Sequence, residues 1–165
     1  VKKRVLIIDT NFKHNSLTQE LLLGNTINKK LESGADVRGL IGKGNSSSEM
    51  GEDDFVSSII SSTSHRGISL IGNSGGDSSP SEIFAGRDFK SMIKKLSGMY
   101  DYIFMEGAAL NGYSDTKELV DYVDKVITVF SSASVIKQAD MESIGFLNSL
   151  NGKLMGAVLN GIALR

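Results

Sequence analysis

Short runs of apolar and β-branched residues recur along the chain, and polar or amphipathic stretches separate them. The runs cover residues 5–8, 68–71, 103–105, 126–130 and 155–159. A transmembrane helix needs about 20 consecutive apolar residues, so none of these runs is long enough to cross a bilayer. Their length and composition predict β-strands that are buried on both faces.

Segments with helical periodicity lie between several of these runs. Apolar residues recur at near-helical spacing over 115–122 and over 136–150, and Ser16 with Gln19 fits a capping box at the start of a helix over 16–23. Alternation of strands and helices predicts parallel pairing with right-handed crossovers. We therefore expect a three-layer α/β fold, in which helices flank a mostly parallel sheet, and a single domain over residues 1–165.

Composition narrows the function classes. The 165 residues are 40% hydrophobic and carry a net charge of -1 without a basic stripe, which argues against nucleic-acid binding. The basic cluster at residues 2–4 is interpreted as a solvated entry to the first strand. No cysteine is present, which excludes disulfides and thiolate metal sites. Because the chain starts with Val1, we expect a piece of a longer protein, with any membrane anchor outside it.

The middle of the chain, residues 24–79, is rich in glycine and serine. We expect surface loop there, with one or two short helices around the strand at 68–71. The stretch from Gly39 to Gly44 does not match the phosphate-binding motif G-x-x-x-x-G-K-[ST], because its spacing is wrong and no hydroxyl follows Lys43.

Polar side chains follow the ends of the predicted strands. Asp9 and Asn11 follow the first strand, Glu106 follows the strand at 103–105, and Asn160 follows the last. In an open parallel sheet these strand ends share one edge, where ligands bind. A lone carboxylate at a strand end is often only a helix or turn cap. Two at one edge, Asp9 and Glu106, make an ion or phosphate site an equal alternative, and they suit a hard cation such as magnesium.

The loop GNSGGDSSP, residues 72–80, reaches the same edge. Backbone N–H groups in such a loop can bind an anion, but Asp77 would repel one. We interpret the loop as structural, with Ser79 or Ser81 capping a helix that begins near Ser81. His14 and His65 lack partners at metal-ligand spacing, and we expect both at the surface.

Four segments together resemble one family. They are RVLIIDTNFKHN, ISLIGNSGGDSSPSEIF, YDYIFMEGAALNGYSDTKELVDYVDKVITVF and GKLMGAVLNGI. In order and spacing they are similar to the strand and loop motifs of bacterial tyrosine kinases, the cytoplasmic domains of polysaccharide co-polymerases. The wider group of MinD- and ParA-like ATPases shares much of this pattern.

The resemblance implies an ATP and magnesium site, and this chain departs from it at the catalytic positions. Asp9 and Asn11 stand where the family has two aspartates, and Glu106 stands where it has a third. Lys13 and His14 replace two arginines. Asparagine cannot act as a general base. By resemblance, the cofactor-binding positions are Asp9, Asn11, Lys13, Glu106 and Asn160, with Asp9 and Glu106 as metal ligands.

Two functional hypotheses follow from the resemblance. The first is a non-catalytic cytoplasmic module of an exopolysaccharide or lipopolysaccharide chain-length regulator, which self-associates and binds the polymerisation machinery at the inner face of the membrane. The second is an active tyrosine autokinase or ATPase whose phosphate-binding loop lies before Val1; a MinD- or ParA-like ATPase is a further alternative. The family places the strand of that loop between the third and fourth strands of this chain, so we expect its sheet to close up, borrow a strand or expose edges.

Overall fold

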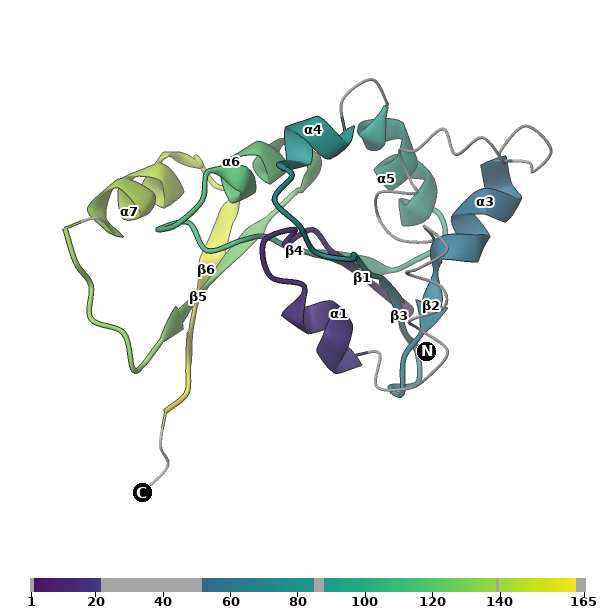
Figure 1. The fold of residues 1–165 in the computed structure, drawn as a ribbon, viewed down its shortest axis with the longest axis horizontal. Coiled ribbons are helices and arrows are strands. Elements are labelled where there is room, and N and C mark those ends of the chain that lie inside the picture. Colours follow the sequence, from purple (N-terminus) through teal and green to yellow (C-terminus); the bar gives the residue numbers. More distant parts are fainter. Residues whose placement is uncertain (1, 22–51, 85–87, 139, 163–165) are drawn as a thin grey trace. The chain divides into compact units, whose positions relative to one another are not determined.

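The structure is a computed structural model that describes residues 2–21, 52–84, 88–138 and 140–162. The chain divides into two compact units, Val1–Ala108 and Ala109–Arg165, and each is described by itself. Figure 1 labels the elements of both. That the two units form the single domain expected from the sequence stays a prediction. The described residues contain no helix that is both long and apolar enough to span a membrane.

The first unit is built around a four-stranded sheet. Its strands follow the order β2-β3-β1-β4. Their bounds are Ser61–Ser62 for β2, Ile68–Ile71 for β3, Val5–Asp9 for β1 and Tyr102–Glu106 for β4. β1 pairs in parallel with β3 and with β4, whereas β2 is antiparallel to β3. The parallel pairing and the strands at β1, β3 and β4 confirm the sequence predictions, and β2 adds a strand that the sequence did not indicate.

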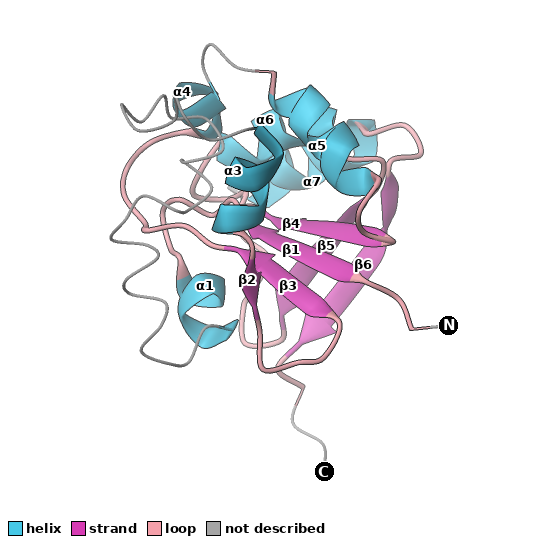
Figure 2. Cartoon of the chain, turned by 90° about the vertical axis from the view of Figure 1, so that its right-hand side faces the viewer, coloured by secondary structure: helices cyan, strands magenta, loops and turns pink. Residues whose placement is uncertain are grey.

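Helices cover both faces of this sheet. Figures 1 and 2 show α1 on one side and α3 and α5 on the other, so the unit has the three layers expected. The helices of this unit are α1 (Ser16–Leu21), α3 (Glu52–Ile59), α4 (Pro80–Phe84) and α5 (Phe89–Ser97). Instead of closing a capping box with Ser16, the Gln19 amide donates to Oδ1 of Asn15 at 2.8 Å. The segment from Gly39 to Gly44 lies outside the described residues.

Apolar side chains of the sheet and of the helices on the α3 and α5 side meet in a core. Leu6 and Ile8 of β1, Ile59 of α3 and Leu96 of α5 are fully buried. The Phe84 and Phe89 rings stack with their centroids 3.9 Å apart. Full burial of such side chains is the main stabilising contribution to a domain of this size. The core therefore fixes β1 at the centre of the unit.

The second unit is a two-stranded sheet with short helices. Its elements are α6 (Asp115–Leu119), the 3₁₀-helix η1 (Val120–Tyr122), β5 (Val126–Ser131), α7 (Asp140–Ser149) and β6 (Leu154–Asn160). β5 and β6 pair in parallel, with an irregularity at the start of the ladder. The helix predicted over 136–150 is observed over Asp140–Ser149, and Oδ2 of Asp140 accepts the Lys137 N–H just before it.

The prediction of strands buried on both faces is wrong for β5 and β6 of this unit, and also for β4 of the first unit, where Phe104 is 52% exposed. Ile127 and Val129 of β5 are 45% and 63% exposed, and Val158 of β6 is 50% exposed. β5 has one strand partner among the described residues, and so does β4 at the end of the other sheet. The sequence left three arrangements open: a sheet that closes up, a sheet that borrows a strand, and a sheet with exposed edges. The two separate sheets agree with exposed edges.

Candidate functional site

Asp9 ends β1 in a fully buried position. Its Oδ1 accepts the Asn11 N–H at 3.1 Å, and its Oδ2 accepts both the backbone N–H of Thr18, at 3.0 Å, and the Thr18 hydroxyl. Burial raises the pKa of Asp9, while the hydrogen bonds from Thr18 and Asn11 oppose that rise. Oδ2 therefore holds α1 against the end of β1, and Oδ1 holds the turn that follows β1.

Asn73 completes this arrangement, and sequence reasoning missed it. Its side chain is fully buried, its Nδ2 donates to the Asp9 carbonyl at 3.0 Å, and its Oδ1 accepts the Gly75 N–H at 2.7 Å. Its backbone N–H donates to the Thr18 hydroxyl at 3.1 Å. A sequence signal was available, because Asn73 directly follows a strand and a glycine. Asparagine side chains at such positions often hydrogen-bond the backbone of their own loop.

Gly72 permits the close approach of α1 to this loop. A Cβ at Gly72 would lie 2.8 Å from Cγ2 of Thr18, closer than side chains tolerate. The loop over 72–80 is thereby fixed to β1 and α1. At its end Ser79 and Glu82 form a capping box, since Ser79 Oγ accepts the Glu82 N–H at 3.2 Å and Glu82 Oε2 accepts the Ser79 N–H at 2.8 Å. The predicted Ser79 cap is confirmed.

Glu106 lies beside Asp9, because the β1–β4 register pairs the two residues. Thr10 fixes the end of β4 by donating its N–H and its hydroxyl to the Glu106 carbonyl. The Glu106 carboxylate is half-buried, and its Oε2 has no hydrogen-bond partner among the described residues. Burial first, and then the charge of Asp9, raise the pKa of Glu106 to about 7, against a smaller lowering by the Asn11 amide.

The remaining predicted site residues divide between the two units. Asn11 is buried and its Oδ1 accepts the His14 N–H at 3.1 Å, which caps the turn after β1. Lys13 donates to the Asp77 carbonyl and so contacts the loop over 72–80. Asn160 ends β6 in the second unit, where its Oδ1 accepts the Gly161 N–H. The structure thus brings together Asp9, Asn11 and Glu106, with Lys13 at the neighbouring loop.

These residues offer few ligands for a cation. Among the described residues no group of three or more His, Asp or Glu side chains is placed to hold a metal ion. Both oxygens of Asp9 already accept hydrogen bonds, so Oε2 of Glu106 is the unengaged carboxylate oxygen of the pair. Magnesium can be held by one or two carboxylates when phosphates and waters complete its six ligands. The assignment of Asp9 and Glu106 as metal ligands stays a prediction.

Comparison with known proteins connects this geometry to a fold. No protein-family model matches the chain. The Staphylococcus aureus protein named "Putative tyrosine-protein kinase CapB" is 28% identical over 81 residues, which are 49% of this chain and 36% of that protein. The chain therefore spans about a third of that relative.

Solved structures extend the likeness to nearly the whole chain. The chimerical protein CapA2B2 matches with a TM-score of 0.70 at 19% identity, over 98% of this chain and 64% of that one. The kinase domain of the Escherichia coli tyrosine kinase ETK matches with a TM-score of 0.70 at 17% identity, over 99% of this chain and 57% of that one. The fold is that of the bacterial tyrosine kinase domains.

This result confirms the resemblance and the α/β fold class predicted from the sequence. A plasmid partition protein from Borrelia burgdorferi also matches, with a TM-score of 0.58 at 19% identity, over 95% of this chain and 65% of that one. At such identities the likeness establishes the fold, and the chemistry must be argued from the site.

Proposed function

We propose that this chain is a kinase-like module of a capsule, exopolysaccharide or lipopolysaccharide assembly protein that has kept the fold and lost phosphoryl transfer. The observation that carries the proposal is Asn11, which stands where the resemblance expects a catalytic aspartate. Its side chain caps a turn through the His14 N–H, and an amide cannot accept a proton from an attacking hydroxyl.

Asp9 supports the same interpretation. Its carboxylate accepts hydrogen bonds from Thr18 and Asn11, which supports a role in packing α1 and the turn after β1 over a role in binding a ligand. On this proposal the module acts by contact, as a length or assembly regulator at the inner face of the membrane. The partners we propose are further copies of itself and the polysaccharide polymerisation machinery.

Self-association has physical support in the exposed apolar strands. Tyr102 and Phe104 of β4 are 53% and 52% exposed, and Val129 of β5 is 63% exposed. Strand edges with unpaired backbone groups invite pairing with another chain. Light scattering over a concentration series, with and without ATP and magnesium, tests this part. We expect association that nucleotide does not change, and a monomer at all concentrations would contradict it.

One observation favours the alternative, an active tyrosine autokinase or ATPase. Glu106 keeps a carboxylate at the strand end, with an unengaged oxygen that magnesium would accept as a ligand. The activity would be ATP-dependent autophosphorylation on tyrosine, and it would need a phosphate-binding loop upstream of Val1. Phosphotyrosine appearing in the full-length protein after incubation with ATP and magnesium, and disappearing in Glu106→Gln, would establish this function and refute the first.

A further inference from the structure

A pocket of about 540 Å³ lies at the amino ends of the strands in the first unit, at the opposite end of β1 from Asp9. Four segments contribute to it: the entry to β1, the β2–β3 hairpin, the start of β3 and the loop between α5 and β4. Its polar lining includes Arg4, Ser62, Thr63, Arg66, Ser69 and Tyr100. We infer that this pocket binds phosphate monoesters, with the phosphate between Arg4 and Arg66 and the organic group against Met99 and Tyr100.

The backbone brings Arg4 and Arg66 close together at the start of the β1–β3 ladder. Val5 pairs with Ile68 in the β1–β3 ladder, and the Val5 N–H donates to the Gly67 carbonyl at 2.9 Å. Arg4 and Arg66 each precede one partner of that hydrogen bond. Gly67 makes the turn possible, because its φ is +89° and a Cβ there would lie 3.3 Å from the Lys3 carbonyl.

The charge of the pocket is not neutralised from within. No aspartate or glutamate is among its described lining residues, and the Arg66 side chain forms no hydrogen bond or ion pair with a described residue. Asp101 lies next to the lining and accepts the Arg4 backbone N–H at 2.7 Å and the Lys3 ammonium at 3.3 Å. Lys3 offsets part of the Asp101 charge and Arg4 also interacts electrostatically with it, so the guanidinium of Arg66 keeps the stronger attraction for an anion.

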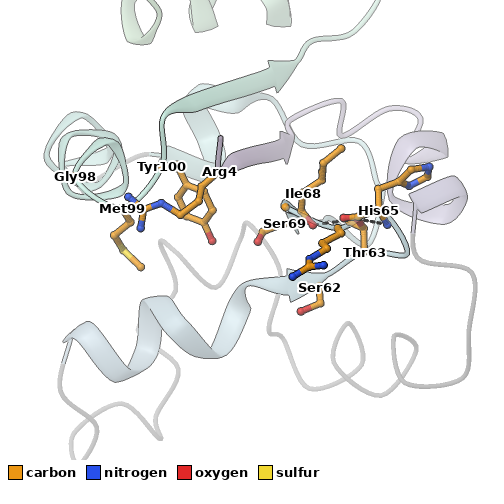
Figure 3. Close-up of a pocket in the computed structure, with 11 residues that line it drawn as sticks. Arg4, Ser62, Thr63, His65, Ile68, Ser69, Gly98, Met99 and Tyr100 are labelled. Atoms are coloured by element: carbon orange, nitrogen blue, oxygen red, sulfur yellow. Dashed lines mark hydrogen bonds between the residues drawn. The ribbon is translucent and has the colours of Figure 1, made fainter. Parts of the chain in front are cut away.

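Hydroxyl groups add further donors. Figure 3 shows Arg4, Met99 and Tyr100 on one side of the pocket and Ser62 on the other, with Ser69 between them. The hydroxyls of Ser62 and Ser69 have no partner among the described residues, whereas Thr63 is occupied by the hairpin, where its hydroxyl accepts the His65 N–H at 3.1 Å. His65 points away from Arg4 and Tyr100 in Figure 3, so we leave it out of the site.

These donors suit a phosphate better than a carboxylate. A phosphate monoester presents three terminal oxygens and close to two negative charges, and a guanidinium can bind two of those oxygens at once. Two guanidinium groups with two serine hydroxyls exceed what the two oxygens of a carboxylate can accept. The side chains of Met99 and Tyr100 add an apolar wall, which free phosphate cannot use.

The proposal is tested by titrating the full chain with phenyl phosphate, glucose 1-phosphate, inorganic phosphate and, as a neutral control, glucose. The backbone amide signals of Gly67 and Gly98 report binding in nitrogen-15 NMR spectra. We expect saturable shifts with at least one ester, weaker binding of inorganic phosphate and no shift with glucose. Arg66→Gln and Arg4→Gln should each weaken ester binding about tenfold, the effect of losing one charge-assisted hydrogen bond.

Lys94→Gln is the matched control, because it removes one positive charge from an exposed position of α5 outside the pocket. It should leave ester binding unchanged. Shifts that do not saturate, or an equal loss of binding in Lys94→Gln, would overturn the site. Inorganic phosphate binding as tightly as both esters would overturn the role given to Met99 and Tyr100. A thermal melt of each variant confirms that the fold is kept.

Discussion

β1 and β5 carry similar apolar sequences, VLIID and VITVFS, but their surroundings differ. Leu6 and Ile8 of β1 are fully buried, whereas Ile127 and Val129 of β5 are 45% and 63% exposed. β1 has a strand on each side and helices over both faces, whereas β5 pairs only with β6 among the described strands. A strand is specified locally, but its burial depends on neighbours. The first unit therefore holds its own core, and the second exposes apolar strand residues.

The largest expected effect comes from truncating the buried strand. Ile8→Ala should destabilise the first unit by about 2–5 kcal/mol, because it removes buried methyl groups and leaves a cavity. Val129→Ala should cost less than about 1 kcal/mol, since the side chain is mostly exposed. Urea unfolding measured for both variants checks the difference, and equal losses would show that β5 is as deeply packed as β1.

Removing the Asn73 side chain should have the next largest effect. Asn73→Ala leaves the Asp9 carbonyl and the Gly75 N–H without their partner, at a cost of about 1–3 kcal/mol. Asp77→Ala, at an exposed position in the same loop, is the control and should cost less than about 0.5 kcal/mol. Equal melting temperatures of the two variants would show that the loop is not fixed to β1 as described.

Glu106→Gln should stabilise the chain in a way that depends on pH. Because its folded-state pKa is raised to about 7, ionised Glu106 disfavours the folded state as pH rises from about 4.5 to 7. Glutamine carries no charge, so the variant should match the parent at pH 4 and exceed it at pH 8. The half-buried position limits the gain to on the order of 1 kcal/mol.

Melting temperatures across that pH range measure the effect. A loss of stability at pH 8 would show that the Glu106 carboxylate is a structural hydrogen-bonding group, and the repulsion from Asp9 would then not dominate at this strand end.

The smallest change in stability is expected for Val129→Thr, which keeps the shape of an exposed strand residue and replaces a methyl group by a hydroxyl. Urea unfolding should shift by less than about 0.5 kcal/mol. Self-association, if it uses β5, should weaken in light scattering. Unchanged association would assign the contact to a surface other than β5.

How well the sequence predicts each feature of the fold depends on whether local sequence or long-range contacts specify that feature. Continuous apolar runs indicated β1, β3, β4, β5 and β6, because strand composition is a local property. α5 was missed although Asp88 caps it through the Ser91 N–H and Phe89, Ile93 and Leu96 recur at helical spacing. The gathering of Asp9 and Glu106 followed from parallel strand order, and the register confirms it.

Other features depended on tertiary contacts that no local pattern reveals. The engagement of Oδ2 of Asp9 comes from Thr18, which lies nine residues away in α1. The burial of Asn73 comes from the approach of α1 past Gly72. The place of Arg4 at a pocket comes from the β2–β3 hairpin, while residues 2–4 are all exposed, as expected of a solvated strand entry.

The central claim is that the chain has kept the fold and lost the site for phosphoryl transfer. Calorimetric titration of the chain with ATP and magnesium tests this claim most directly. We expect weak or no binding, because Asn11 caps a turn, Asp9 is engaged by Thr18 and Asn11, and the sequence contains no phosphate-binding loop motif. ADP with magnesium, titrated in parallel, should behave the same way. Micromolar binding of ATP that requires magnesium and is lost in Glu106→Gln would contradict the account.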